Sequence, residues 1–90
     1  MITWDETKRR ENLRKHGVDF ADAQIIFDGY TVTSEDKREA YGEQRLQTLG
    51  LLRGVTVAVV HTERGNQIRV ISIRKTTKHE DRFYFSQIPD

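Results

Sequence analysis

The chain has 90 residues, of which 36% are hydrophobic and 32% charged, with a formal net charge of +1 and no cysteine. A chain of this length builds only one modest core, so we expect a single domain over residues 1–90. The lack of cysteine excludes disulfide bonds and thiolate metal sites, and no stretch approaches the roughly 20 apolar residues of a membrane span. The N-terminus has no basic region followed by an apolar run, so we expect a cytoplasmic protein without a membrane segment.

The N-terminal third predicts a short strand followed by two helices. Ile2–Trp4 is the candidate strand. The first helix begins near Asp5, has acidic residues at its start and basic residues at its end, and stops at Gly17. The segment Asp19–Phe27 predicts a second, more apolar helix with Asp19 as its N-cap.

The first helix has one strongly apolar residue, Leu13, so most of its surface faces water or a partner. Four polar residues fall on nearby helical positions: Lys8, Asn12, Lys15 and His16. They form either a polar working face or an ordinary charged helix surface, and the second interpretation is the more common one.

The middle of the chain predicts two pairs of strands. Tyr30–Thr33 and Arg45–Leu51 are candidate strands, and the charged segment Ser34–Glu43 between them predicts a long, mobile excursion. Val55–Thr62 is the most apolar strand, so we expect it at the centre of the sheet. A short turn containing glycine connects it to the alternating strand Gln67–Ile73.

Thr77 and Glu80 have the spacing of a capping box, which predicts a last helix over Thr77–Gln87 beside the end of the preceding strand. Together the elements predict an α+β fold. Two N-terminal helices and a C-terminal helix pack on an antiparallel sheet of about four strands.

The segment from Arg64 to His79 has five cations and no acidic residue, although the whole chain is nearly neutral. The cations are Arg64, Arg69, Arg74, Lys75 and Lys78. A helix N-terminus offers free N–H groups and a partial positive charge. The start of the last helix and these cations therefore predict a site that holds phosphate, with a solvated basic surface as the alternative.

The three histidines, His16, His61 and His79, are far apart in the sequence and lack metal-binding spacing, so we expect no metal site and no cofactor. No serine lies in the context of a catalytic nucleophile. The chemistry that remains is metal-free cleavage of RNA, which supplies its own nucleophile, the 2′-hydroxyl group. The protein then supplies a group that takes the proton and cations that stabilise the transition state.

Several residues are candidates for these roles. His61, Glu63 and His16 are alternative proton carriers, and the first two share one strand face if that strand continues. Trp4 or Tyr84 can stack on a base, although aromatic residues at such positions more often belong to the core. The catalytic candidates are His61, Glu63, Arg64, Arg74 and Lys75, and the RNA-binding candidates are Arg69, Lys78, Lys8 and His16.

Two other classes of function also fit the sequence. A non-catalytic module that binds nucleic acid uses the same cations for counterion release alone. A protein-interaction module uses the thinly packed first helix or an exposed sheet edge to receive another polypeptide.

Several motifs follow one another along nearly the whole chain. They are Trp4-Asp5-Glu6-x-Lys8, Asn12-Leu13-x-Lys15-His16-Gly17-Val18-x-Phe20, Gly42-Glu43-x-Arg45, and the long segment from His61 to Lys75. In order and spacing they resemble the BrnT-type toxins of bacterial type II toxin–antitoxin pairs. Ile73 departs from the small residue expected at its position, and Thr76 departs from alanine.

This resemblance implies a RelE-like fold and a ribonuclease that halts translation. It also implies a BrnA-type antitoxin with a ribbon-helix-helix domain, so that the toxin reaches operator DNA only through its antitoxin. The basic positions of the family look like Arg64, Arg69, Arg74 and Lys75 here, with Lys8 and His16 as polar positions on the first helix.

Overall fold

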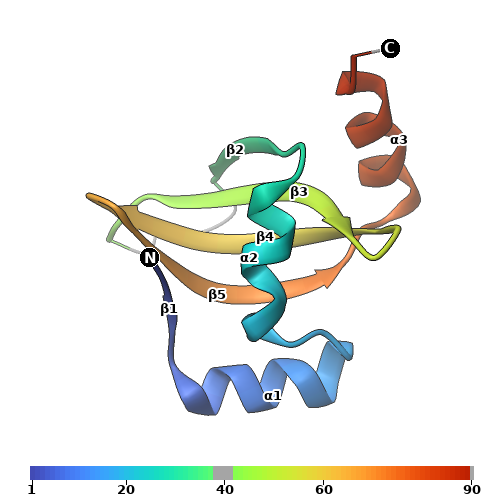
Figure 1. Cartoon of the computed structure of the whole chain (residues 1–90). Coiled ribbons are helices and arrows are strands. Elements are labelled where there is room, and N and C mark those ends of the chain that lie inside the picture. The colour runs from blue at the N-terminus through green and yellow to red at the C-terminus, as the bar shows by residue number, and fades with distance from the viewer. Residues whose placement is uncertain (38–41, 90) are drawn as a thin grey trace.

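The sheet has five strands in the order β1-β5-β4-β3-β2 (Figure 1). A computed structural model, which describes residues 1–37 and 42–89, gives their bounds as β1 Ile2–Trp4, β2 Val32–Asp36, β3 Arg45–Leu52, β4 Val55–Arg64 and β5 Gln67–Lys75. The apolar strand β4 is central, as its sequence predicts. The excursion expected from Ser34 starts later, because β2 continues to Asp36; residues 38–41 of that excursion lie outside the described residues.

The direction of β1 corrects the expected antiparallel sheet. Strands β2 to β5 run antiparallel to their neighbours, but β1 runs parallel to β5, with Ile2 opposite Ile68 and Trp4 opposite Val70. A hairpin forces two strands to be antiparallel, whereas β1 and β5 are far apart in the sequence and no turn fixes their direction. The fold is therefore α+β with a mixed sheet of five strands.

Local signals set the ends of the helices. The helices are α1 Glu6–His16, α2 Ala23–Asp28 and α3 Lys78–Gln87, with a 3-10 helix at Phe20–Asp22 before α2. The Asp5 carboxylate accepts the Lys8 N–H at 3.0 Å and starts α1, and Gly17 ends it with a φ of 72°. The predicted capping box of α3 is confirmed, because the side chains of Thr77 and Glu80 each accept the other residue's N–H.

Helices pack on both faces of the sheet. Successive residues of a strand point to opposite sides, so the apolar side chains of β4 contribute to a core on each face. On one face, which we call the α2 face, Val57 and Val59 of β4 belong to a core that includes Phe20 of the 3-10 helix. On the opposite face, the α3 face, Ala58 packs with Tyr84 of α3. Figure 1 shows α3 at one end of the sheet, so no helix of residues 1–37 and 42–89 covers the rest of the α3 face.

A glycine lets α2 lie close to the sheet. A Cβ atom built on Gly50 of β3 would lie 2.8 Å from Cγ2 of Ile26 in α2. Carbon atoms do not pack at that distance, so any larger residue at position 50 forces α2 or its side chain to move. The helix predicted over Asp19–Phe27 is divided: Asp19 caps a 3-10 helix through the N–H of Ala21, and α2 begins only at Ala23, without a side-chain cap.

Asn12 of α1 completes the edge of β5 beyond the end of β1. Its Nδ2 donates to the carbonyl of Ile73 at 2.8 Å, and its Oδ1 accepts the Ile73 N–H at 3.1 Å. Nδ2 also donates to the carbonyl of Val18 at 3.0 Å, and the residue is buried. The Asn12 side chain thus takes the place of a neighbouring strand. It holds α1 against the sheet and does not belong to an exposed polar face.

Candidate nucleic-acid interface

The predicted site residues do not converge on one pocket. The structure divides them among four surface depressions and the interior of the protein. Two of the depressions include arginines of the α3 face, and these two are described first.

The first, which we call the hairpin depression, brings together Glu63, Arg64 and Arg69 beside the β4–β5 turn. It has a volume of about 470 Å³ and is completed by Glu43, Gln44, Thr62 and Gln67. The Arg64 side chain is 91% exposed, and its Nη2 lies 4.0 Å from Oε2 of Glu43, so this ion pair is weak. Arg69 is exposed and has no carboxylate partner among residues 1–37 and 42–89. The hairpin depression therefore offers cationic groups that are accessible to an anion.

The second, the Arg74 depression, has a volume of about 410 Å³ and is lined by Ser34, Glu35, Asp36, Lys37, Gln47, Arg74 and Glu80. Arg74 forms a bidentate ion pair with Glu80, with Nη1–Oε1 at 2.8 Å and Nη2–Oε2 at 2.9 Å. These hydrogen bonds lower the pKa of the Glu80 carboxyl to about 2, and the Thr77 N–H contributes to the same shift. The guanidinium of Arg74 is held in one orientation as a result.

Arg69 and Arg74 lie on the same face of the sheet. The pairing of β4 with β5 shifts its register between Val60 and His61, so Val70 and Ile73 both belong to the core under α2 although they are three residues apart. Their sequence neighbours Arg69 and Arg74 therefore both point to the α3 face. Arg69 is opposite Thr62 of β4, and Arg74 is opposite Ala58. Their partners Ala58 and Thr62 are four positions apart in β4, which corresponds to roughly 13 Å along the strand.

Arg45 of β3 is a third arginine on the α3 face. Thr48 bonds to His61 on the α2 face, so Arg45, an odd number of residues earlier, points to the opposite side. In the sequence Arg45 stands only as part of the motif Gly42-Glu43-x-Arg45, which assigns it no role. The alternation of its own strand was the signal that identifies its face.

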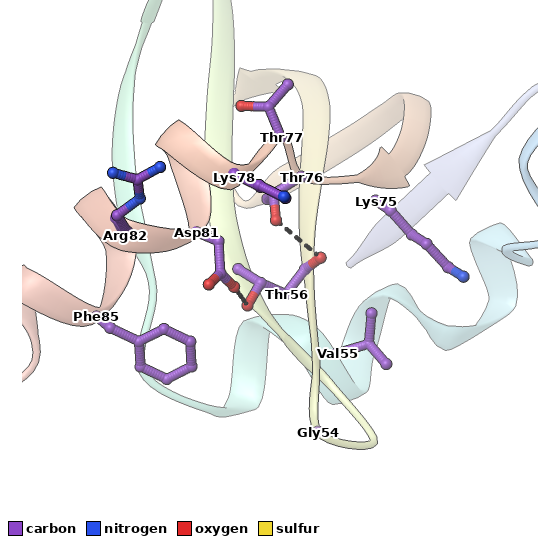
Figure 2. Close-up of a pocket in the computed structure, with 10 residues that line it drawn as sticks. All are labelled: Gly54, Val55, Thr56, Lys75, Thr76, Thr77, Lys78, Asp81, Arg82 and Phe85. Carbon is purple, nitrogen blue, oxygen red and sulfur yellow. Dashed lines mark hydrogen bonds between the residues drawn. The ribbon is translucent and has the colours of Figure 1, made fainter.

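At the start of α3, where the sequence predicts a phosphate site, the capping box uses two of the N–H groups. Thr77 Oγ1 accepts the Glu80 N–H at 3.2 Å, and Glu80 Oε1 accepts the Thr77 N–H at 2.9 Å. A carboxylate of the protein itself already occupies this helix end. Lys75 and Lys78 instead line a separate groove of about 470 Å³ at the foot of α3 (Figure 2).

Lys8 and His16 line a fourth depression, of about 250 Å³, between α1 and β5. Its other lining residues are Glu11, Asn12, Lys15, Ile71 and Ser72. These two RNA-binding candidates are therefore together, but they lie in a different depression from the arginines of the α3 face.

His61 lies in the interior, apart from all four depressions. It is 0% exposed, its Nε2 lies 2.7 Å from Thr48 Oγ1, and its ring meets the edge of Phe27 with centroids 5.2 Å apart. Its Nδ1 is buried without a hydrogen-bond partner, and burial lowers the pKa of the imidazole. Since α2 covers this strand face, the structure separates His61 from Arg69 and Arg74. Glu63 and His16 are the proton carriers that remain at the surface.

The two aromatic candidates for base stacking both belong to the core. Tyr84 is 0% exposed and donates its hydroxyl hydrogen to the carbonyl of Tyr30 at 2.8 Å. Trp4 is partly buried and packs against the core under α2. Their burial agrees with the core interpretation, which the sequence analysis preferred.

In the described ranges 1–37 and 42–89, no three His, Asp or Glu side chains are grouped so that they can hold a metal ion. None of the helices in those ranges combines the length and apolar character needed to cross a membrane. The described side chains of the α3 face include guanidinium groups and carboxylates. Such groups bind phosphates and stabilise negative charge that develops during a reaction.

Comparison with curated proteins finds no match. The model of one protein family, described as the ribonuclease toxin BrnT of type II toxin–antitoxin systems, matches residues 4–80. The matched region runs from β1 into the first turn of α3 and contains Arg45, Arg69 and Arg74. The chain therefore belongs to the BrnT family of ribonuclease toxins of type II toxin–antitoxin systems.

Proposed function

We propose that this toxin is a metal-independent endoribonuclease and that its RNA substrate lies across the open part of the α3 face. The observation that carries the proposal is the placement of Arg45, Arg69 and Arg74 on one sheet face, with Arg74 bound to Glu80 at the start of α3 and Arg45 and Arg69 farther from that helix. A separation of roughly 13 Å lets Arg69 and Arg74 contact different phosphates of one strand.

The reaction proposed is attack of the 2′-oxygen on the adjacent phosphorus while the bond from phosphorus to the 5′-oxygen breaks. The products are a 2′,3′-cyclic phosphate and a 5′-hydroxyl group that takes its proton from water. We assign removal of the 2′-hydroxyl proton to Glu63, which lines the hairpin depression with Arg64 and Arg69. Alternation from His61 places Glu63 on the α2 face, so RNA that reaches it passes over the exposed end of the β4–β5 hairpin. The two arginines stabilise the charge of the transition state, and Arg74, oriented by Glu80, holds a flanking phosphate. His16 is the alternative proton carrier.

The central experiment is incubation of the purified protein with RNA in excess EDTA. The proposal predicts products with 2′,3′-cyclic phosphate ends. Arg69→Ala should lower the rate by about 100-fold with little change in stability, because Arg69 is exposed and lacks a carboxylate partner among the described residues. Arg14→Ala, an exposed arginine on α1, is the matched control and should keep the rate. Intact RNA in EDTA, or equal losses in the two variants, contradicts the proposal.

Inhibition of translation, a RelE-like arrangement and a BrnA-type ribbon-helix-helix antitoxin form the finer part of the proposal. The family places an antitoxin beside the toxin, and the open α3 face is a surface that such a partner can cover. In this proposal the toxin contacts operator DNA only through the antitoxin. Coexpression with the neighbouring reading frame should give a stable complex that no longer cleaves RNA. A toxin that stays monomeric and active beside that product contradicts the partner assignment.

A second function, nucleic-acid binding without cleavage, is favoured by one observation. His61 is buried, and Glu80, with a pKa of about 2, is a poor proton acceptor. This alternative predicts an affinity for RNA that falls steeply with salt, without cleavage products at any salt concentration.

A further inference from the structure

We propose that the groove at the foot of α3 binds an acidic, partly apolar segment of the antitoxin. The inference rests on the toxin–antitoxin function and adds the surface and the chemistry of contact. Figure 2 shows the groove, which we call the α3 groove, between the first turns of α3 and the start of β4.

One face of α3 forms a wall of the α3 groove. Lys78, Asp81, Arg82 and Phe85 are spaced three or four residues apart, so they lie on a single side of the helix. The rest of the lining comes from Gly54, Val55 and Thr56 of β4 and its turn, and from Lys75, Thr76 and Thr77. The groove has a volume of about 470 Å³.

The charges in the α3 groove are not balanced. Within residues 1–37 and 42–89, Lys75, Lys78 and Arg82 have no carboxylate partner for their side chains. The one carboxylate of the lining, Asp81, accepts the Thr56 hydroxyl hydrogen at 2.6 Å and is held against β4. Three cations therefore face one engaged anion, which favours an occupant with acidic side chains.

The α3 groove also exposes apolar side chains. Val55 is 44% exposed and Phe85 is 50% exposed, although both are large apolar residues. The Phe85 ring is held by an edge contact with Tyr84, with centroids 5.2 Å apart and an interplanar angle of 78°. Tyr84 itself is fully buried. Phe85 is thus an aromatic group fixed in place at the surface, which is typical of an interface anchor.

These features favour a protein segment over RNA. The N–H groups of Thr77 and Glu80, which would bind phosphate, are already used by the capping box. The aliphatic side chain of Val55 has no hydrogen-bonding group or ring to recognise a nucleotide, whereas it packs well with an apolar side chain of a peptide.

The test measures the affinity of the toxin for the antitoxin encoded by the neighbouring reading frame. Phe85→Ser and Arg82→Glu should each raise Kd by about tenfold or more. Phe83→Ser is the matched control for the aromatic change, because Phe83 lies on the same helix and is 48% exposed but does not line the groove. Arg14→Glu is the control for the charge change. Both controls should leave Kd within about twofold.

Thermal unfolding of Phe85→Ser checks that the loss of its contact with Tyr84 does not unfold α3. Arg82→Glu changes only an exposed side chain and keeps the proposal testable if Phe85→Ser is unstable. Unchanged affinity of Arg82→Glu overturns the proposal. So does weaker RNA binding by this variant, because the groove would then be part of the RNA path. If the wild-type toxin cleaves no RNA but both variants lose the antitoxin, the ribonuclease proposal fails and the docking proposal stands.

Discussion

The two faces of the sheet are built from the same strands but differ in how much of their surface is buried. On the α2 face, Val57, Val59 and His61 of β4 are 1% exposed or less, and α2 lies directly against them. On the α3 face, the helix covers only one end, and the area beyond it carries arginines and polar residues. One face therefore stabilises the fold, while the described part of the other face carries the arginines at which we propose that RNA binds.

Arg74 both stabilises the fold through Glu80 and belongs to the proposed RNA-binding surface, so its replacement should have the largest effect. Arg74→Ala should lower ribonuclease activity by about 100-fold and, unlike Arg69→Ala, also lower the free energy of unfolding by about 1–3 kcal/mol. The second loss arises because Glu80, partly buried, loses its bidentate partner.

The pH dependence of stability separates these two effects. The pKa of Glu80 is lowered to about 2 from 4.5, so its contribution is present above pH 4.5 and is lost as the pH falls toward about 2. Denaturant unfolding across this range should show a fall in wild-type stability that is much smaller in Arg74→Ala. Parallel curves for the two proteins would show that the ion pair does not stabilise the fold.

Asn12→Ala tests how α1 is held against β5. It should lower the free energy of unfolding by about 2–4 kcal/mol, because the N–H and carbonyl of Ile73 are left buried and unpaired. Glu11→Ala changes the exposed neighbour on the same helix and should stay within about 0.5 kcal/mol. Chemical denaturation measures both. An effect of Asn12→Ala no larger than that of its control would mean that α1 is not held through this residue.

Gly50→Ala should have a smaller effect, about 1–3 kcal/mol, since the new methyl group displaces Ile26 of α2. Gly29→Ala is a suitable control, because a Cβ there meets nothing closer than the Ile26 carbonyl at 3.8 Å. The α3 face should keep its ribonuclease activity in both variants at a temperature where they are folded. Loss of activity in folded Gly50→Ala would show that the two faces are coupled.

Replacement of His61 should have the smallest effect, which is a change in how the free energy of unfolding depends on pH. Burial lowers its pKa from the usual 6.5, so the unfolded chain binds the proton first and stability falls as the pH drops below 6.5. His61→Gln removes the titrating group and should flatten the unfolding free energy over this pH range, while activity at pH 7 stays near that of the wild type. Complete loss of ribonuclease activity in the folded variant would show that His61 takes part in catalysis.

Local signals in the sequence were sufficient for both ends of α1, for the start of α3 and for the central strand, but not for the start of α2. Asp5, Gly17 and the Thr77–Glu80 capping box act within a few residues, so they are visible without the fold. The parallel direction of β1 depends on a contact between opposite ends of the sequence, and no local pattern encodes it.

The site was only partly predictable for the same reason. The basic segment was correctly recognised as unusual, but alternation alone does not say which strand face a helix will cover. His61 therefore looked as accessible as Glu63, although α2 buries the first and leaves the second exposed. The ion pair between Arg74 and Glu80 was not predicted either. The spacing of Glu80 from Thr77 already accounts for it as a capping residue, so the sequence gives no sign of a second partner.

The most direct test of where RNA lies is NMR titration of the toxin with a 2′-O-methyl RNA, which binds without supplying a nucleophile. The account predicts that the largest amide shifts occur on the α3 face, at Thr62, Arg69 and Arg74 and at neighbouring residues of β3. Shifts confined to α1 and α2, with the amides of β4 and β5 unchanged, would contradict it.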